Sequence, residues 1–145
     1  MFNVRDLVRQ KGSKVYSVAP EVTVLEALKV MAEGNIGAVL VMQDGRVTGI
    51  LSERDCVRKL DLDGRTAAGT QVEDIMTRDV LFVHASQSLD ECMALMIERN
   101  IRHLPVYEDN NLIGVISIRD VLKEVVDYQQ FMISQLEHYI SGARQ

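Results

Sequence analysis

The sequence lacks several features that would point to particular classes of protein. It has only two cysteines, Cys56 and Cys92, and no apolar run long enough to span a bilayer. Both cysteines lie within apolar helical patterns, where a free thiol behaves as a small buried hydrophobic group. The sequence therefore favours reduced thiols and a cytoplasmic location, with no membrane partner.

An excess of positive charge is also absent. The 145 residues carry a formal net charge of −5 at pH 7, and the field of such a chain repels polyanions, which argues against nucleic acid as a partner. The segment 1–12 contains charged side chains and lacks the apolar run of a signal peptide. With 47% hydrophobic residues, the chain has the composition of one compact domain or of two closely packed halves.

A repeat organises most of the chain. Shifting the sequence by 65 residues aligns residues 15–60 with residues 80–125 without a gap. A repeat of this kind corresponds to one folded unit, so the sequence predicts two copies of one small domain. The identical pairs include Val15/Val80, Glu26/Glu91, Met31/Met96, Asn35/Asn100, Gly49/Gly114, Ser52/Ser117, Arg54/Arg119 and Asp55/Asp120.

Each copy has the same order of expected elements. A short apolar segment predicts a strand, and a capping box with helical apolar spacing predicts a helix after it. Two segments joined by a turn then predict a hairpin, and a second helix follows. The expected segments are 15–18, 23–34, 36–42, 47–51 and the residues from Ser52 onwards in the first copy, and 80–83, 88–100, 101–107, 112–116 and the residues from Ser117 onwards in the second.

Residues that tolerate positive φ mark the turns and helix ends. Asp44-Gly45 and Asn110-Asn111 are expected at the hairpin turns, and Gly34 and Asn100 near the helix ends, where left-handed backbone is often needed. Each copy is thus β-α-β-β-α, with an apolar sheet face that it cannot cover alone. We expect an α+β fold in which the two repeats pack sheet to sheet with approximate twofold symmetry, followed by a long C-terminal helix.

A second, weaker sequence similarity links the segments that precede the two copies. Residues 4–7 (VRDL) resemble residues 72–75 (VEDI), and each segment is expected to lead into its own repeat. Polar residues with Gly64 and Gly69 predict a linker between the repeats. The predicted organisation is a first repeat with its lead-in at 1–60, a linker at 61–71, a second repeat at 72–125 and a C-terminal helix at 126–145.

The motif Gly-x-x-Ser-x-Arg-Asp closes each hairpin. Glycine leaves room for a ligand beside the strand, and a serine at a helix start lies where free N–H groups attract phosphate. Arginine offers a planar fork to phosphate oxygens, and aspartate accepts hydrogen bonds from ribose hydroxyls. The motif therefore predicts a nucleotide site, although Ser-x-x-Asp is also an ordinary helix cap that duplication would copy equally well. Its residues are Gly49, Ser52, Arg54 and Asp55 in the first copy and Gly114, Ser117, Arg119 and Asp120 in the second.

The repeated unit, the doubled motif and the run 101–106 (IRHLPV) resemble the cystathionine-β-synthase-like (CBS) domains, which occur as tandem pairs in stand-alone proteins. The resemblance implies that Asp55 and Asp120 hold ribose hydroxyls and that Ser52 and Ser117 contact phosphate. It also places the base between the first strand and the hairpin of each copy. The base pockets would then contain Val15, Tyr16 and Ala38 in one site and Val80, Ile101, His103 and Pro105 in the other.

The two pockets are expected to be chemically unequal, because Gly37-Ala38 in the first copy corresponds to Arg102-His103 in the second. Arg102 and Lys14 are further candidates for phosphate contacts, and the alternative for Lys14 is an exposed lysine at a strand edge. His84 and His138 have no partner at metal-ligand spacing, so no metal is expected. No nucleophile with its base and no redox dithiol is visible, which argues against an enzyme.

The segment 121–141 contains neither proline nor glycine and has apolar residues at helical spacing. It is expected to pair with the same helix of a second copy, and the alternative is a helix folded back over its own core. The leading hypothesis is a cytoplasmic regulatory homodimer that binds an adenine nucleotide (AMP first, then ADP, ATP or NAD(H)), changes its dimer geometry and signals to an unidentified regulated protein. The alternatives are a scaffold that binds no nucleotide and an enzyme that turns a nucleotide over.

Overall fold

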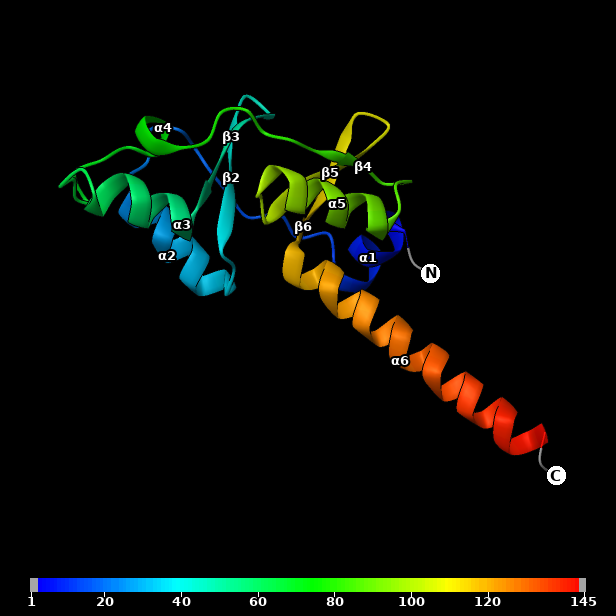
Figure 1. The fold of residues 1–145 in the computed structure, drawn as a ribbon. Coiled ribbons are helices and arrows are strands. Elements are labelled where there is room, and N and C mark those ends of the chain that lie inside the picture. The colour runs from blue at the N-terminus through cyan, green and yellow to red at the C-terminus, as the bar shows by residue number, and fades with distance from the viewer. Residues whose placement is uncertain (1–2, 144–145) are drawn as a thin grey trace. The chain divides into compact units, whose positions relative to one another are not determined.

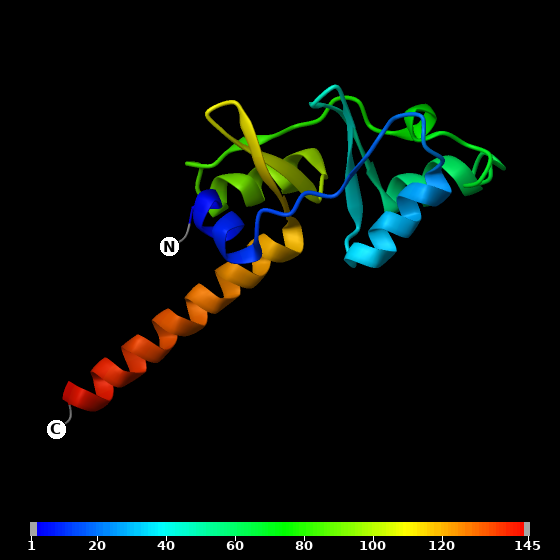
Figure 2. The ribbon, with the colours of Figure 1, turned by 180° about the vertical axis from the view of Figure 1, so that it is seen from behind.

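The computed structural model describes residues 3–143 and divides them between two compact units. One unit is the contiguous segment Lys14–Leu81, and the other combines the residues up to Ser13 with those from Phe82 onwards. Figures 1 and 2 show the elements of both units from opposite sides. A compact unit is therefore not the same stretch of chain as a sequence repeat.

The unit Lys14–Leu81 contains one three-stranded sheet. Strand β1 pairs parallel with β2, and β2 pairs antiparallel with β3. Apolar residues of α2 such as Val24 and Met31 pack with Val39, Val41 and Leu51 of the sheet to form its core. The elements are β1 (Ser17–Val18), α2 (Val24–Gly34), β2 (Ala38–Gln43), β3 (Arg46–Ser52), α3 (Glu53–Cys56), a π-helical segment (Val57–Asp61) and α4 (Val72–Ile75).

The other unit has the same topology. Strand β4 pairs parallel with β5, and β5 pairs antiparallel with β6. Its elements are α1 (Val4–Lys11), β4 (Val83–His84), α5 (Leu89–Arg99), β5 (His103–Glu108), β6 (Asn111–Ser117) and α6 (Ile118–Ala143). The repeated β-α-β-β-α order and the long last helix confirm the predicted α+β class.

The predicted Thr23 and Ser88 caps start the helices as expected, but among residues 3–143 neither Glu26 nor Glu91 returns the bond that would complete a capping box. The side chains of Thr23 and Ser88 accept hydrogen bonds from the N–H groups three residues later, at 3.2 and 3.1 Å. Both helices end at an asparagine in the left-handed conformation, Asn35 at φ 51° and Asn100 at φ 53°. The expectation was therefore right for Asn100 and wrong for Gly34, which is still helical.

Packing explains the glycine at position 34. A Cβ atom there would lie 2.8 Å from Cζ of the Tyr16 ring, so a larger residue would displace that ring. Gly34 thus lets β1 and the end of α2 approach each other.

The hairpin turns lie at equivalent positions of the two copies. In the first, Asp44 and Gly45 have φ of 52° and 77°, as predicted. In the second, Asp109 and Asn110 have φ of 50° and 65°, one residue earlier than predicted, and Asn111 already belongs to β6. The pairing of His103 with Ser117 and of Glu108 with Asn111 fixes the turn position, and two consecutive asparagines could not reveal it.

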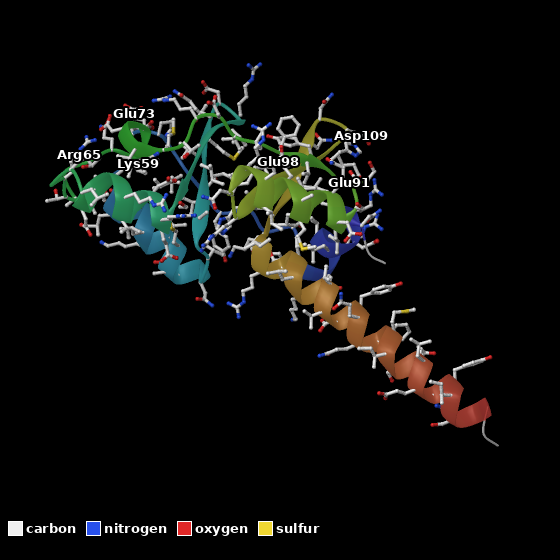
Figure 3. The ribbon with its side chains drawn as sticks, in the orientation of Figure 1. Lys59, Arg65, Glu73, Glu91, Glu98 and Asp109 are labelled. Carbon is white, nitrogen blue, oxygen red and sulfur yellow. The ribbon has the colours of Figure 1, made fainter. Side chains whose placement is uncertain are left out.

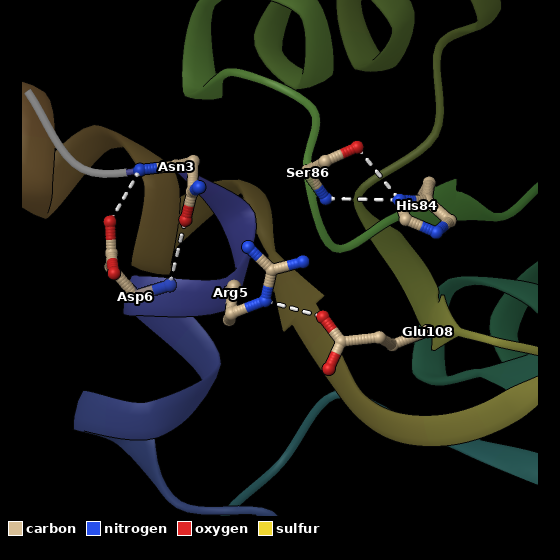
Figure 4. Close-up of polar contacts among 6 residues, drawn as sticks. All are labelled: Asn3, Arg5, Asp6, His84, Ser86 and Glu108. Carbon is tan, nitrogen blue, oxygen red and sulfur yellow. Dashed lines mark hydrogen bonds and ion pairs between the residues drawn. The ribbon is translucent and has the colours of Figure 1, made fainter.

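The two lead-in segments do not stay with the repeats that follow them. Helix α1 packs in the unit of the second repeat, where the N–H groups of Val4 and Arg5 donate to the carbonyls of Gln87 and Ala85 at 3.0 and 2.8 Å. Arg5 also pairs with Glu108 (Figure 4). This arrangement differs from the expected one, since an apolar helix face can be covered by either repeat and the similarity of the lead-in segments does not indicate which.

Helix α4 and the predicted linker pack in the unit of the first repeat. The N–H of Val72 donates to Val22 O at 2.9 Å, and Thr70, which is buried, accepts from the N–H of Val24 at 2.9 Å. The end of the segment 61–71 thus covers the start of α2 instead of crossing between units. The boundaries at 60, 71 and 125 remain a prediction about repeats along the sequence.

Helix α6 joins two predicted elements into one. The last helix of the second repeat and the expected C-terminal helix form a continuous helix of 26 residues. Every residue from Val126 to Gly142 is exposed (Figure 3), so this helix is not folded back over its own core. Among residues 3–143, no helix has the length and apolar character that crossing a membrane would require.

Candidate functional site

The serine and aspartate of the motif bond to each other at the start of a helix in both copies. Ser52 Oγ accepts from the N–H of Asp55 at 3.0 Å, and Asp55 Oδ2 accepts from the N–H of Ser52 at 3.1 Å. The corresponding distances for Ser117 and Asp120 are 3.1 and 2.8 Å. The helix cap, which was the alternative to a nucleotide site, is therefore present in both copies.

The cap uses only one oxygen of each carboxylate. Asp120 Oδ2 accepts from the N–H of Ser117 and also from Lys11 Nζ at 2.6 Å. Within residues 3–143, no hydrogen bond or ion pair of the structure involves Asp120 Oδ1. One oxygen of a half-buried, oriented carboxylate thus stays available to accept hydrogen bonds.

Lys11 contacts the second motif, although no sequence pattern indicated it. Its ammonium bridges Asp120 Oδ2 and the carbonyl of Val115, the latter at 2.9 Å. Lys11 ends helix α1, so it reaches the motif only because α1 packs in this unit. The similarity of residues 4–7 to 72–75 associates this helix with the first repeat along the sequence, so it did not indicate this contact.

The first copy holds its aspartate differently. Lys59 Nζ lies 3.6 Å from Asp55 Oδ1 and donates to Ile75 O at 2.8 Å. The carboxylate oxygen that the cap leaves over thus faces an ammonium in this copy. Because Lys59 comes from the helix that follows the motif, the two sites obtain their cations from different elements.

Charges around the second motif shift two pKa values. Burial alone would raise the pKa of Asp120, but hydrogen bonds from Lys11 and Ser117 outweigh it and hold this pKa below its ordinary value. Burial lowers the pKa of His103, and the positive charges of Lys11 and Arg102 lower it further against the opposing effect of Asp120. At neutral pH this site therefore combines a carboxylate, an ammonium and a neutral imidazole.

The strand register brings some predicted base-pocket residues to the motifs. Ala38 pairs with Ser52, and His103 pairs with Ser117. Pro105 is buried in the same strand as His103, and the half-buried Ile101 precedes that strand. The predicted inequality of the two sites is thus located beside each serine, where one copy has a methyl group and the other an imidazole.

Other predicted residues lie elsewhere. Val80 belongs to the unit Lys14–Leu81, so the unit that holds His103 does not itself supply it. The half-buried Val15 precedes β1, and Tyr16, whose carbonyl accepts from the N–H of Leu40 at 3.1 Å, packs its ring on Gly34. Lys14 places its ammonium 4.8 Å from the centre of that ring.

The three arginines that were predicted to contact phosphate flank the motifs. Arg54 is half-buried in the first turn of α3, and Arg119 is exposed in the first turn of α6. Arg102 is exposed, and its carbonyl accepts from the N–H of Ile118 at 2.8 Å, which fixes it beside the start of α6. All three remain predicted phosphate ligands.

The motif glycines have a structural reason that differs from the expected one. A Cβ at Gly49 would lie 2.5 Å from Sδ of Met76, and a Cβ at Gly114 would lie 3.0 Å from Cγ1 of Val8. The space beside each strand is therefore filled by the segment that includes α4 or α1. It does not admit a ligand at that point.

The cysteines are unsuited to nucleophilic chemistry. Burial raises the pKa of both Cys56 and Cys92 to about 11, and neighbouring carboxylates act in the same direction. Both thiols are therefore protonated at neutral pH. In the part of the chain that the structure describes, no group of three or more His, Cys, Asp or Glu side chains is placed to hold a metal ion.

Comparison with known proteins agrees with the repeated fold. The model of the CBS domain matches residues 4–62 and 72–127. A putative signal-transduction protein with CBS domains from Burkholderia ambifaria is 44% identical, with a TM-score of 0.84 over 86% of this chain and 94% of its own. The mitochondrial CBS domain-containing protein CBSX3 of Arabidopsis thaliana is 34% identical over 96% of this chain and 72% of its own length.

A more distant structure shares the fold alone. The CBS domain pair of MJ0100 has a TM-score of 0.76 at 22% identity, over 88% of this chain and 98% of its own. Because the family model covers most of the sequence in two copies, and both copies have the expected topology, the chain belongs to the CBS domain family as a tandem pair.

Proposed function

We propose that this CBS pair is a non-catalytic regulatory module that binds an adenine nucleotide, and that the second repeat supplies the principal site. The observation that carries the proposal is the carboxylate of Asp120, which the helix cap orients through one oxygen while the other stays available. Two vicinal hydroxyls of a ribose are suitable donors to that oxygen. The ammonium of Lys11 adds a positive charge for an anionic tail.

The family supports a regulatory role with a bound ligand. Tandem CBS domains are typically regulatory and ligand-binding, and stand-alone pairs are generally not catalytic. The structure of the MJ0100 pair is a complex with 5-methylthioadenosine and S-adenosyl-L-methionine. Both of these ligands contain an adenosine moiety, which favours the same chemical class here.

The difference between the copies favours the second site over the first. Asp55 keeps its remaining oxygen near Lys59, so a ribose there would compete with an ammonium. His103 beside Ser117 gives the second site a neutral ring that can accept or donate a hydrogen bond to a base, whereas Ala38 cannot. We infer that AMP is the first ligand to test, with ADP, ATP and NAD(H) next, and that binding alters the geometry of a homodimer that a regulated protein detects.

Isothermal titration of the full chain with AMP, ADP, ATP, NAD(H) and S-adenosylmethionine tests this proposal. Asp120→Asn removes a charge-assisted acceptor, so the best ligand should bind about 10- to 100-fold more weakly. Asp55→Asn should change that affinity less than twofold. The matched control is Asp6→Asn, because Asp6 and Asn3 form the same reciprocal cap on α1 at 3.0 Å (Figure 4).

The controls separate binding from folding. An equal loss of affinity in Asp6→Asn would mean that the cap, rather than the acceptor, explains the effect of Asp120→Asn. The alternative function is a scaffold that binds no nucleotide, and it predicts an unchanged melting temperature with every ligand. A bound ligand at 100 times its Kd should stabilise the protein by about 2.7 kcal/mol.

A further inference from the structure

Helix α6 carries an apolar stripe that none of residues 3–143 covers. Its members recur at intervals of three and four residues, so they lie on one side of the helix. The large apolar members are between 40% and 74% exposed. The α6 stripe consists of Leu122, Val126, Met132, Ile133, Leu136, Tyr139 and Ile140, together with the polar Gln129.

The area of the stripe matches a specific interface. If a large apolar residue has a full surface of about 200 Å², these exposed fractions leave on the order of 700 Å² per copy. A monomer's largest apolar patch is usually about 300–600 Å². Two such stripes facing each other would cover about 1,400 Å², which lies within the range of stable interfaces.

The chemistry of the stripe fits a second copy of itself. Lys123, Glu124 and Asp127 fall on other sides of the helix at helical spacing, and Glu137 lies at the edge of the stripe, so the centre of the stripe offers no charge to a polar partner. An apolar surface without charge is complementary to an identical surface, and a twofold axis closes such a pair without open ends.

Gln129 favours a parallel over an antiparallel orientation of the two helices. In an in-register parallel pair, Leu122, Gln129 and Leu136 occupy equivalent positions of successive heptads and each meets its own copy, so the two Gln129 amides can bond to each other. In an antiparallel pair centred on the stripe, Gln129 would face Ile133 of the partner. Each amide would then be buried without a hydrogen-bond partner, at a cost of about 1–3 kcal/mol.

We propose that two copies of this chain associate through a parallel, in-register pair of α6 helices along the α6 stripe, with the two Gln129 side chains facing each other. This inference specifies the homodimer of the proposed function but does not depend on a nucleotide. A protein that binds nucleotide as a monomer would overturn this inference and the homodimer of the proposed function, but not the nucleotide site. A dimer without nucleotide binding would overturn the nucleotide proposal alone.

Disulfide cross-linking tests the direction of the helices. Leu122→Cys and Leu136→Cys, each oxidised gently in the full chain, should both form covalent dimers on a non-reducing gel. The control is Ser134→Cys, on the opposite side of the helix, which should form almost none. Cys56 and Cys92 are buried, so the unmodified protein should give no background.

Two further results would overturn the proposal. One is an antiparallel pattern, in which Leu122→Cys and Leu136→Cys give no dimer alone, whereas a mixture of Leu122→Cys with Ile140→Cys cross-links. The other is a monomeric mass of the unmodified protein at about 50 μM in analytical ultracentrifugation, a concentration at which an interface of this size should be populated. Leu136→Asp should shift the dimer to monomer and leave the circular dichroism of the two units in place.

Discussion

At the scale of single residues, the motif aspartates cap a helix and are also the proposed acceptors for a ligand, two roles that the sequence could not separate. Asp120 caps α6 with one oxygen and leaves the other available, so the cap and the acceptor are one arrangement. The Ser-Asp pair could be predicted because its members are three residues apart. Lys11 could not be predicted, because it lies 109 positions from Asp120 and reaches it only through tertiary packing.

Lys11→Met should separate a role in charge from a role in folding. The Lys11–Asp120 pair is about a third exposed, so its loss should destabilise the protein by no more than about 1 kcal/mol. Affinity for AMP should fall about three- to tenfold, while affinity for uncharged adenosine should change less than twofold, because only AMP carries a phosphate. Titration calorimetry measures both.

Arg9→Met is the matched control for Lys11, since Arg9 is exposed on the same helix. It should leave both affinities unchanged. If adenosine and AMP lose affinity equally in Lys11→Met, Lys11 acts by positioning Asp120 and does not interact with the phosphate.

His103 should make stability depend on pH. Its pKa in the folded protein lies below its ordinary value of 6.5, so the unfolded chain binds a proton that the folded protein excludes. The stability from the neutral imidazole is therefore complete above pH 6.5 and is lost as the pH falls toward the folded pKa. Urea unfolding between pH 5 and 8 should show the free energy of the wild type falling relative to that of His103→Ala as the pH decreases.

His103→Ala gives the second repeat the residue that the first has at Ala38, so it is a natural reference. Asp120 does not contribute to this window, because its pKa lies below its ordinary value of 3.8 and it titrates in stronger acid. A constant difference between wild type and His103→Ala over the whole range would contradict the assignment of the effect to burial of the imidazole.

At the scale of elements, local signals were sufficient for order and type. Helix N-caps, apolar spacing and the Asp44-Gly45 turn specify β-α-β-β-α because each acts within a few residues of chain. They did not specify which repeat each lead-in helix covers, since α1 and α4 have similar sequences and apolar faces. The motif glycines are consistent with the observed packing of α4 and α1, because Gly49 leaves space for the side chain of Met76 and Gly114 leaves space for that of Val8.

Alanine at the motif glycines should therefore destabilise the protein without any ligand. In Gly49→Ala, the new Cβ would lie 2.5 Å from Sδ of Met76 and 3.0 Å from the backbone oxygen of Thr77, so a cost of about 2–3 kcal/mol is expected. In Gly114→Ala, the nearest atom is a methyl carbon of Val8 at 3.0 Å, and about 1 kcal/mol is expected. Equilibrium denaturation of the free protein measures both.

Gly142→Ala is the control for the alanine substitution itself. No atom of the described part of the chain lies within 4 Å of its Cβ position, and alanine favours a helix, so stability should be unchanged or rise by up to about 1 kcal/mol. Stable Gly49→Ala and Gly114→Ala proteins that had lost only nucleotide affinity would restore the original interpretation, in which the glycines leave room for a ligand.

At the scale of the whole molecule, the folded units and the sequence repeats divide the chain at different places. The duplication was visible because its copies align at a constant offset. The exchange of lead-in segments was not visible, because burial of an apolar helix depends on which surface it reaches and not on its neighbour in sequence. Val4, Leu7 and Val8 are at most 4% exposed in the unit that begins again at Phe82.

Fragments cut at the two kinds of boundary should behave differently. A fragment of residues 14–81 keeps α4 with its sheet, whereas residues 1–71 lose Val72, Ile75 and Met76, all at most 7% exposed. The burial of three such side chains contributes about 5–9 kcal/mol of apolar stabilisation, and the shorter fragment lacks it. This loss is comparable to the stability of a whole domain. Residues 14–81 should therefore unfold in a cooperative thermal transition, followed by circular dichroism, and residues 1–71 should not.

The second repeat extends the same test. Residues 72–145 lack α1 and with it Val4, Leu7 and Val8, so this fragment should also fail to fold cooperatively. Residues 1–13 can be added back after position 145 through a flexible linker that is long enough to let α1 reach the same packing site. This addition should restore part of the cooperative transition. Cooperative folding of both 1–71 and 72–145 would show instead that each lead-in can pack on its own repeat, and that the non-contiguous units are not needed for stability.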